Sequence, residues 1–308
     1  MVADGDVLVV GESLVDVVEH ADGSRREHPG GSAANVAVAL ARLDRPVRLA
    51  TALADDRYGA IVATYLGRDR VSLAVDPETI ERTASARAVL DAEGAARYEL
   101  DLEWVLTPVP AEPAPLAVHA CSLAAVLAPG AEEVLATLRR LRGTALVTYD
   151  VNARPVLTGS GEELAAAVER VVALADLVKA SDEDLLAVYP ELSEDEAVAR
   201  LLSLGPVAVV LTRGAAGATW HGSGRSVSVA APTVEVVDTI GAGDTFSAAL
   251  LDALWARGLV GPGAAERIAA LPRRHRTKVL THAVRAGALA TTRPGADPPY
   301  RAEVGSPT

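Results

Sequence analysis

Hydrophobic positions follow two patterns that alternate along the chain. Short apolar runs, typical of buried parallel strands, occur at 7–10, 116–120, 145–149, 177–179 and 207–211. Between and after them lie segments with helical periodicity, at 132–141, 162–173, 182–189 and 194–204. Strands that alternate with helices predict an α/β fold in which helices cover a mainly parallel sheet.

Two early segments depart from this alternation and predict β-hairpins. One surrounds residues 21–24, and the other joins 86–91 to 95–101. They predict a small antiparallel sheet beside the main sheet, with segments of about 12–29 and 84–103, and we expect it to act as a lid. No linker or internal repeat divides the sequence, which indicates a single domain over 1–308. We expect the tail from Pro294 to be mostly irregular, because Pro298 and Pro299 block a helix.

Charge and cysteine content exclude several classes of protein. The formal net charge is −12, which argues against binding to nucleic acid or to an anionic membrane. The single cysteine, Cys121, excludes an internal disulfide, and the six histidines form no zinc motif. Acidic residues near the N-terminus do not fit a secretory signal, and no apolar stretch is long enough to span a membrane. We therefore expect a cytoplasmic protein that acts on small molecules.

The segment from Val234 onward carries the strongest chemical signal. We expect a strand over 234–237, a turn through Gly241, Ala242 and Gly243, and then an Ala/Leu-rich helix. The backbone N–H groups of this turn could point at an anion at the positive end of the helix, which would make a phosphate cradle. Asp244 could then accept a proton from an attacking hydroxyl. The alternative is a tight turn in which Asp244 is an ordinary N-terminal carboxylate.

A second polar segment precedes a small-residue helix expected at 36–43. Gly30 and Gly31 permit the close approach of a ligand, and Asn35 offers both a donor and an acceptor to a polyol. Asp16 follows the first strand, at the end of the sheet where ligands usually bind. Its carboxylate could accept hydrogen bonds from two adjacent sugar hydroxyls. The alternatives are a helix cap for Asn35 and a solvated lid residue for Asp16.

Other signatures are missing or weak. The sequence contains no G-x-x-x-x-G-K-[ST] motif, no G-x-G-x-x-G motif after the first strand and no G-x-S-x-G motif, so P-loop, Rossmann and serine hydrolase functions are disfavoured. The basic run at 273–278 is interpreted as a solvated approach to a helix.

Taken together, the two motifs resemble those of the ribokinase-like, or PfkB, family of carbohydrate kinases. The resemblance extends from Gly11–Asp16 to Thr292–Pro299, and Asp238–Asp244 is its most specific part. The glycine pair at 30–31 precedes this segment, as it does in the family, and the two motifs together favour Asp244 as the base that accepts the hydroxyl proton. Bacterial fructokinase-like members are the most similar in four further segments: His119–Leu123, Tyr149–Pro155, Val178–Asp184 and Leu211–Gly217.

The resemblance implies a three-layer sandwich with a β-lid, ATP as phosphate donor, Mg²⁺, and a homodimer that forms through the lid. It implies that Asp244 is the base and that the anion hole consists of Gly241, Ala242 and Gly243. Residues expected to face the sugar are Asp16, Gly30, Gly31 and Asn35, and those on the nucleotide side are Ser181, Thr212, Gly214 and Gly217. Arg154 would contact phosphate or sugar, with a surface ion pair as the alternative. Asp238 and Ile240 match positions at which some relatives hold a monovalent cation such as K⁺.

The sequence departs from the family pattern at three places. Ser181 and Asp184 replace the N-x-x-E motif that organises the metal, so the shorter Asp184 carboxylate would have to reach the Mg²⁺ waters. Cys121 and Ala54 stand where related kinases often have glycine. We expect an ATP-dependent kinase for a primary hydroxyl of a small sugar, with fructose first and 2-keto-3-deoxygluconate or ribose as alternatives. The rival from another class is a catalytically silent protein that binds sugar or nucleotide.

Overall fold

The computed structural model describes residues 5–19, 24–90 and 96–307. Of the hairpin turns predicted at 21–24 and 91–94, all residues but Ser24 lie outside the described residues. The strands are β1 Val7–Val10, β2 Leu14–Glu19, β3 Arg25–Gly30, β4 Val47–Ala50, β5 Ser72–Leu73, β6 Ser85–Leu90, β7 Ala96–Asp101, β8 Ala117–Cys121, β9 Leu146–Asp150, β10 Leu177–Ser181, β11 Ala208–Thr212, β12 Ala218–Gly222 and β13 Val227–Val229. The helices are α1 Ser32–Arg42, α2 Arg57–Arg68, α3 Gly130–Leu141, α4 Pro155–Thr158, α5 Glu162–Val172, α6 Asp182–Val188, α7 Glu194–Ser203, α8 Ala242–Trp255, α9 Ala264–Ala269, α10 Arg273–Ala290 and α11 Arg301–Val304.

The large sheet has the strand order β13-β12-β11-β10-β9-β8-β1-β4-β5. Its strands from β11 to β5 run parallel, whereas β12 and β13 pair antiparallel at one edge. The apolar runs at 7–10, 116–120, 145–149, 177–179 and 207–211 all lie in this sheet, so the expected mainly parallel architecture is confirmed.

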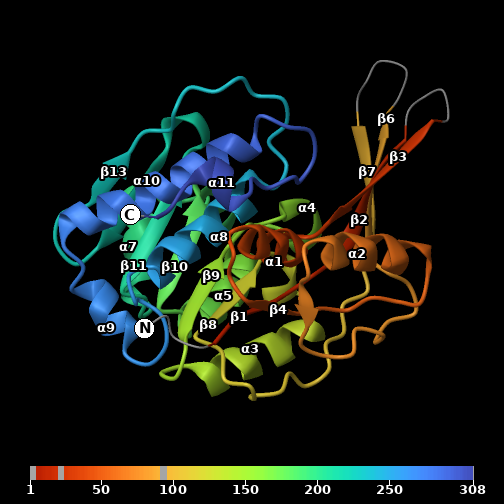
Figure 1. The fold of residues 1–308 in the computed structure, drawn as a ribbon, viewed down its shortest axis with the longest axis horizontal. Coiled ribbons are helices and arrows are strands. Elements are labelled where there is room, and N and C mark those ends of the chain that lie inside the picture. Colours follow the sequence, from red (N-terminus) through yellow and green to blue (C-terminus); the bar gives the residue numbers. More distant parts are fainter. Residues whose placement is uncertain (1–4, 20–23, 91–95, 308) are drawn as a thin grey trace.

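Helices cover both faces of the sheet because its strands are apolar on both sides. Val7 and Val9 of β1 belong to the core beneath α1, α8 and α10. Leu8 and Val10 belong to the opposite core, beneath α3, α5, α6 and α7. The result is a three-layer α/β/α sandwich (Figure 1).

A second, smaller sheet projects from one side of the sandwich, next to α1 and α2 (Figure 1). Its order is β3-β2-β6-β7: β2 pairs antiparallel with β3 and parallel with β6, and β6 pairs antiparallel with β7. The two predicted hairpins therefore join into one separate sheet, as expected, but the sheet is mixed and not antiparallel, because β2 and β6 pair in parallel. Since β3 ends at Gly30 and α1 begins at Ser32, the small sheet leads directly into the core.

Three local expectations are wrong or incomplete. Residues 234–237 form no strand, because the chain here passes beyond the sheet edge, where Val236 and Val237 are each 59% exposed. The basic run at 273–278 is not an approach to a helix but the start of α10. Arg276 in this run is buried, and its guanidinium donates hydrogen bonds to the carbonyls of Leu271 and Ser223. The tail is mostly irregular, as expected, apart from α11. Within the described ranges, no helix has both the length and the apolar character needed to cross a membrane.

Candidate active site

The carboxylate of Asp244 lies between α1 and α8 and is held at both oxygens. Asp244 is in the first turn of α8 and is 7% exposed. Its Oδ1 accepts a hydrogen bond from the Ser32 hydroxyl at 2.7 Å, and its Oδ2 accepts one from Asn35 Nδ2 at 2.8 Å. Both donors lie in the first turns of α1, whose N-cap is Gly31, so Asn35 is not a helix cap. These two bonds fix the orientation of the carboxylate, while each oxygen keeps a further lone pair for a substrate proton.

The turn that precedes Asp244 leaves backbone donors free. Gly241 has φ +72°, and a Cβ there would lie 2.9 Å from the Cβ of Ala296, so a larger residue would be both strained and crowded. The Ala242 N–H donates to the Thr239 carbonyl at 3.3 Å. The N–H groups of Gly243 and Asp244 have no acceptor within the described residues. Free donors at the positive end of α8 suit an anion.

A buried cation lies beside this turn. Lys179 of β10 is 5% exposed, and its Nζ is 3.0 Å from Asp150 Oδ1. Asp150 Oδ2 accepts a hydrogen bond from the Ser247 hydroxyl of α8, and a Cβ on Gly243 would lie 3.2 Å from Lys179 Nζ. Burial opposes the charge of the lysine, but Asp150 and its neighbouring carboxylates hold the pKa of Lys179 above its ordinary value. Lys179 is thus held as a charged partner of Asp150 beside the turn, and the donors left for an anion are the backbone N–H groups at the start of α8.

The small sheet brings Asp16 to the same region. Asp16 pairs with His28 across β2 and β3, and a side chain on Gly30 would collide with the Asp16 carboxylate. Burial raises the pKa of Asp16 to about 6 against the attraction of His28 and Arg154, and the charge of Asp244 adds to the rise. Asp16 is thus a partly buried carboxylate within the electrostatic reach of Asp244. It is not a freely solvated lid residue.

Arg154 is exposed at the start of α4. Its guanidinium donates only to the carbonyls of Asn152 and Ala153, at 3.3 and 2.9 Å. In the part of the chain that the structure describes, no carboxylate forms an ion pair with it, so the surface ion pair is not found. The guanidinium is available to a ligand.

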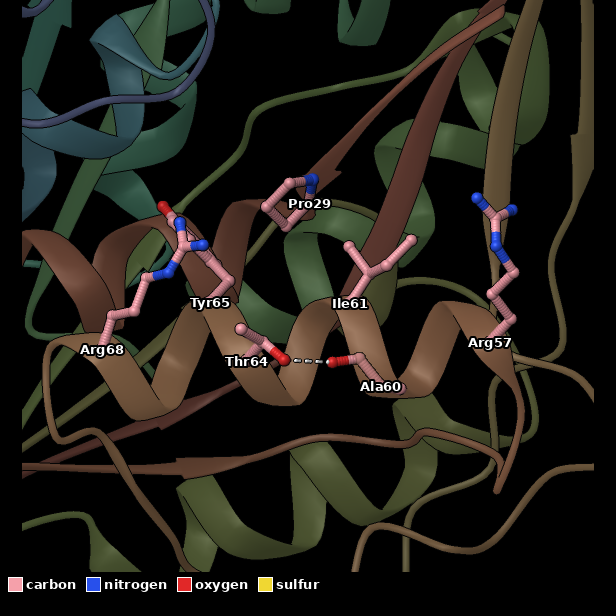
Figure 2. Close-up of a pocket in the computed structure, with 7 residues that line it drawn as sticks. All are labelled: Pro29, Arg57, Ala60, Ile61, Thr64, Tyr65 and Arg68. Atoms are coloured by element: carbon pink, nitrogen blue, oxygen red, sulfur yellow. Dashed lines mark hydrogen bonds between the residues drawn. The ribbon is translucent and has the colours of Figure 1, made fainter.

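A shallow pocket lies on the outer side of this region, between β3 and α2. It has a volume of about 390 Å³ and is lined by Pro29, Arg57, Ala60, Ile61, Thr64, Tyr65 and Arg68. Figure 2 shows Ile61 and Tyr65 rising from α2 beneath Pro29, with the two arginines at opposite ends of the helix. The Tyr65 hydroxyl donates to the Ala296 carbonyl at 3.2 Å and lies 3.5 Å from Asn35 Oδ1. The pocket therefore borders the Asp244 region through Tyr65, but neither Asp244 nor Asp16 lines it.

The residues expected on the nucleotide side gather at the carboxyl ends of two neighbouring strands. Ser181 ends β10 and pairs with Thr212, which ends β11. Gly214 begins the short 3₁₀ helix after β11, and Gly217 follows it with φ +93°. A side chain on Gly217 would collide with the Val229 carbonyl, so this turn must pack closely against β13. Carboxyl ends of parallel strands are where ligands bind in such sheets.

Asp184 is buried, and each of its two carboxylate oxygens accepts one hydrogen bond from a backbone N–H. Its Oδ1 accepts from the Ala153 N–H and its Oδ2 from the Ser181 N–H, each at 2.7 Å, and Ser181 completes a capping box at the start of α6. Among the described residues, no group of three His, Cys, Asp or Glu could by itself hold a metal. This donor set suits Mg²⁺ that arrives with a nucleotide and keeps most of its waters, because one carboxylate near the phosphates is then enough.

Asp238 joins two segments near the turn. Its Oδ1 accepts from the Ile240 N–H at 3.0 Å and its Oδ2 from the Gly295 N–H at 2.8 Å. Ile240 is 51% exposed. The resemblance assigns a monovalent cation to Asp238 and Ile240, and that assignment stays a prediction.

Four residues of the site escaped the sequence analysis as candidates: Glu12, Ser32, Asp150 and Lys179. The signal for Asp150 and Lys179 was that each is a charged residue in or at the end of an apolar strand. Burying a charge there lowers stability unless it is paired with an opposite charge. Ser32 follows the glycine pair directly, and Glu12 lies two residues after the end of β1. Neither could be connected to Asp244 before α1 and α8 were seen to pack together.

A carboxylate held at a helix N-terminus, beside free backbone donors and a buried cation, defines an α/β phosphotransferase that acts on a hydroxyl group. The pfkB family of carbohydrate kinases matches residues 4–303, and the chain belongs to this family. It is therefore a sugar kinase, and the class predicted from the two motifs is confirmed.

Individual relatives of the chain are also sugar kinases. The chain is 31% identical over 301 residues to the fructokinase of Klebsiella pneumoniae, covering 95% of both chains. Its fold matches that of a fructokinase from Xylella fastidiosa with bound ATP, with a TM-score of 0.84, 27% identity and coverage of 97% and 96%. It also matches a fructokinase from Vibrio cholerae O395 with bound fructose, ADP and calcium, with a TM-score of 0.74, 28% identity and coverage of 95% and 94%. A double mutant of that enzyme holds fructose, ADP and potassium.

Proposed function

We propose that the chain is a fructokinase, which transfers the γ-phosphoryl group of ATP to a primary hydroxyl of fructose. The observation that carries this proposal is the Asp244 carboxylate, held by Ser32 and Asn35 directly after the glycine turn. Two of the similar fructokinase structures, one with bound ATP and one with bound fructose and ADP, support the choice of donor and acceptor.

In this proposal the sugar lies between the small sheet and the core. Asp16 and the backbone at Gly30 and Gly31 face it from one side, and Asn35 and Asp244 face it from the other. Because a carboxylate has two acceptor oxygens, the partly buried Asp16 would accept hydrogen bonds from two adjacent hydroxyls. Arg154 has no carboxylate partner within the described residues and would contact the sugar or the transferred phosphate.

Asp244 accepts the proton of the sugar hydroxyl as the oxygen attacks the γ-phosphorus. One O–P bond forms, the bond from the γ-phosphorus to the bridging oxygen breaks, and ADP leaves with that electron pair. Of the predicted anion hole, the Ala242 N–H already donates to Thr239, so the N–H groups of Gly241 and Gly243, joined by that of Asp244, stabilise the charge on the γ-phosphate oxygens. Ser181, Thr212, Gly214 and Gly217 hold the nucleotide, and Asp184 would hold the waters of Mg²⁺. When bound, Mg²⁺ neutralises charge on the β- and γ-phosphates.

The small sheet acts as the lid in this proposal. Asp16 and Gly30 belong to the lid sheet, whereas Asn35 and Asp244 belong to the core, so a movement of the sheet changes the width of the sugar site. Closure would exclude water and limit wasteful hydrolysis of ATP. A ratio of ATP hydrolysed to sugar phosphorylated that stays unchanged after deletion of 84–103 would contradict the lid.

We also propose a homodimer that forms through the lid. In the small sheet, β3 and β7 are edge strands, and an edge strand offers unpaired backbone groups to a second copy. Light scattering on purified protein tests this directly, and a monomer at micromolar concentration would contradict it. We place the reaction in the cytoplasm, where ATP is available and where a free thiol such as Cys121 stays reduced.

A coupled assay of ADP release tests the substrate. Fructose, ribose, 2-keto-3-deoxygluconate, tagatose and nucleosides would be compared by kcat/KM, with a reaction lacking sugar as the control. We expect fructose to give the highest value. A tenfold preference for ribose or 2-keto-3-deoxygluconate would overturn fructose but leave the kinase mechanism intact. Sugar binding without ADP release from any member of the panel would favour a catalytically silent protein. A potassium titration in the same assay tests the cation at Asp238 and Ile240.

A further inference from the structure

A buried glutamate lies next to the site and has no cation to pair with. Glu12, between β1 and β2, is 4% exposed. Its Oε1 accepts from the Ser32 N–H at 3.3 Å and its Oε2 from the Ala124 N–H at 3.2 Å. Within the described residues, no Lys, Arg or His forms an ion pair with it. Burying a carboxylate without a cation lowers the stability of the fold, so we look for a functional role for Glu12.

The contacts of Glu12 continue directly to the base. The backbone N–H of Ser32 donates a hydrogen bond to Glu12. The hydroxyl of the same Ser32 donates to Asp244 Oδ1 at 2.7 Å. Helix α1 has no acidic residue in its first turn, so Glu12 supplies the negative charge that favours the N-terminus of this helix. Its second contact, at Ala124, ties the same point to the short 3₁₀ helix after β8.

The backbone around Glu12 is packed just as closely. Gly31 has φ +94°, and a Cβ there would lie 2.6 Å from the Glu12 carbonyl oxygen and 2.7 Å from the Cα of Ser13. The segment that carries Gly30 and Gly31 toward the sugar therefore rests on Glu12. A displacement of Glu12 would move both the sugar-facing glycines and the hydroxyl that orients Asp244.

We propose that Glu12 is a positioning residue for phosphoryl transfer, which fixes Asp244 through Ser32 without touching the substrate. This inference rests on the proposed kinase function. It predicts a loss in kcat with little change in KM for ATP, because the nucleotide side, at the ends of β10 and β11, makes no contact with Glu12.

The direct test is Glu12→Gln, which keeps the size of the side chain but offers only one acceptor oxygen to two N–H donors. We expect kcat to fall by about 10- to 100-fold, the order of loss caused by a small misplacement of a reacting group. The matched control is Asp176→Asn. Asp176 is a partly buried carboxylate that also accepts a backbone N–H, from Val147 at 2.8 Å, but it lies at the amino end of β10. This control should change kcat by less than about twofold.

A double-mutant cycle separates positioning from a general loss of stability. If Glu12 acts through the Ser32 hydroxyl, Glu12→Gln should cost little further kcat in a Ser32→Ala background. Fully additive losses would overturn the proposal. Should Glu12→Gln fail to fold, Glu12→Asp, which keeps the charge and shortens the reach, replaces it in the same cycle.

The pH profile gives an independent readout. Burial raises the pKa of Glu12 to about 7, and the charge of Asp244 adds to the rise. The other titratable groups that face Glu12 are Cys121 of β8 and Tyr149 of β9, and burial raises the pKa of each well above its ordinary value, so both stay neutral. The wild-type kcat should therefore fall as the pH drops through about 7, and Glu12→Gln should remove this acid limb.

An unchanged limb in Glu12→Gln, or a wild-type kcat in that variant, would overturn the role of Glu12. Wild-type protein without sugar-dependent ADP release would instead contradict the kinase function on which the role rests.

Discussion

Asn35 and Asp244, which are 209 positions apart in the chain, meet through a hydrogen bond of 2.8 Å. This bond joins the fourth residue of α1 to the first turn of α8. Because the Asp244 carboxylate can only accept, the Asn35 amide is oriented with its nitrogen toward Asp244, and its oxygen lies 3.5 Å from the Tyr65 hydroxyl. One asparagine thus connects the expected sugar site with the expected base.

Asp244→Asn should lower kcat by roughly 10²–10⁴, because an amide cannot accept the hydroxyl proton. Its NH₂ group would also face one of the two donors, Ser32 or Asn35. Steady-state ADP release measures the loss, and calorimetry with sugar alone checks that sugar affinity is retained. Turnover within threefold of the wild type would remove Asp244 from the base role.

Asp16→Ala should lower kcat/KM for the sugar by about 10- to 100-fold, because sugar hydroxyls would lose a buried acceptor. The KM for ATP should stay unchanged. Glu19→Gln is the control in the same strand, since Glu19 pairs with Arg87 at the far end of β2. A similar loss in both variants would indicate damage to the small sheet and not a sugar contact.

The sugar KM should also depend on pH. Burial raises the pKa of Asp16 to about 6, so this carboxylate becomes protonated as the pH falls through about 6. Protonation removes an acceptor, and the KM for the sugar should rise below this pH while the KM for ATP stays constant. Initial rates from pH 5 to 8 would show this rise, and a flat sugar KM over that range would contradict the role of Asp16.

EDTA should abolish activity and excess Mg²⁺ should restore it, because phosphoryl transfer needs the charge on the phosphates to be neutralised. Asp184→Ala should then raise the Mg²⁺ concentration needed for half-maximal activity. Asp182→Ala, two positions earlier and in the same helical turn, is the matched control. If Asp184→Ala leaves the Mg²⁺ titration unchanged, another residue holds the metal waters.

Asp252 should be a major determinant of stability. It is fully buried in α8 and accepts hydrogen bonds from Arg45, His282 and Arg301 at 2.6 to 2.8 Å. Asp252→Asn should lower the free energy of unfolding by roughly 3–5 kcal/mol, the usual loss when a buried ionic network is broken. Thermal denaturation measures this loss. Glu132→Gln, which breaks an exposed pair with Arg170, should cost about 1 kcal/mol or less.

The same network predicts a pH dependence of stability. Burial alone would raise the pKa of Asp252, but hydrogen bonds from Arg301 and His282 and the charge of Arg45 lower it to about 2. The contribution of Asp252 is therefore complete above the ordinary value of 3.8 and is lost as the pH falls toward 2. The stability difference between wild type and Asp252→Asn should shrink over this interval, and a constant difference would contradict the assignment.

The sequence by itself determined the alternation of strands and helices, the existence of a second sheet and the place of Asp244 after a glycine turn. These features are local, because the apolar period and the turn residues are written in consecutive positions. The sequence prediction failed at 234–237, where three valines around Glu235 predict a strand. Strand formation depends on a neighbouring edge with which to pair, and the chain here has left the sheet.

Only the tertiary structure decided which distant groups complete the site. Packing of α1 against α8 places Ser32 and Asn35 on Asp244, and the register of β9 with β10 places Asp150 beside Lys179. Two further features leave no local pattern in the sequence. One is the position of Asp16, in the small sheet, near Asp244, and the other is the burial of Glu12. Hydrogen bonds and ion pairs of this kind join residues far apart in the chain, so their partners are fixed by how helices and strands pack, whereas the elements themselves are fixed by periodicity.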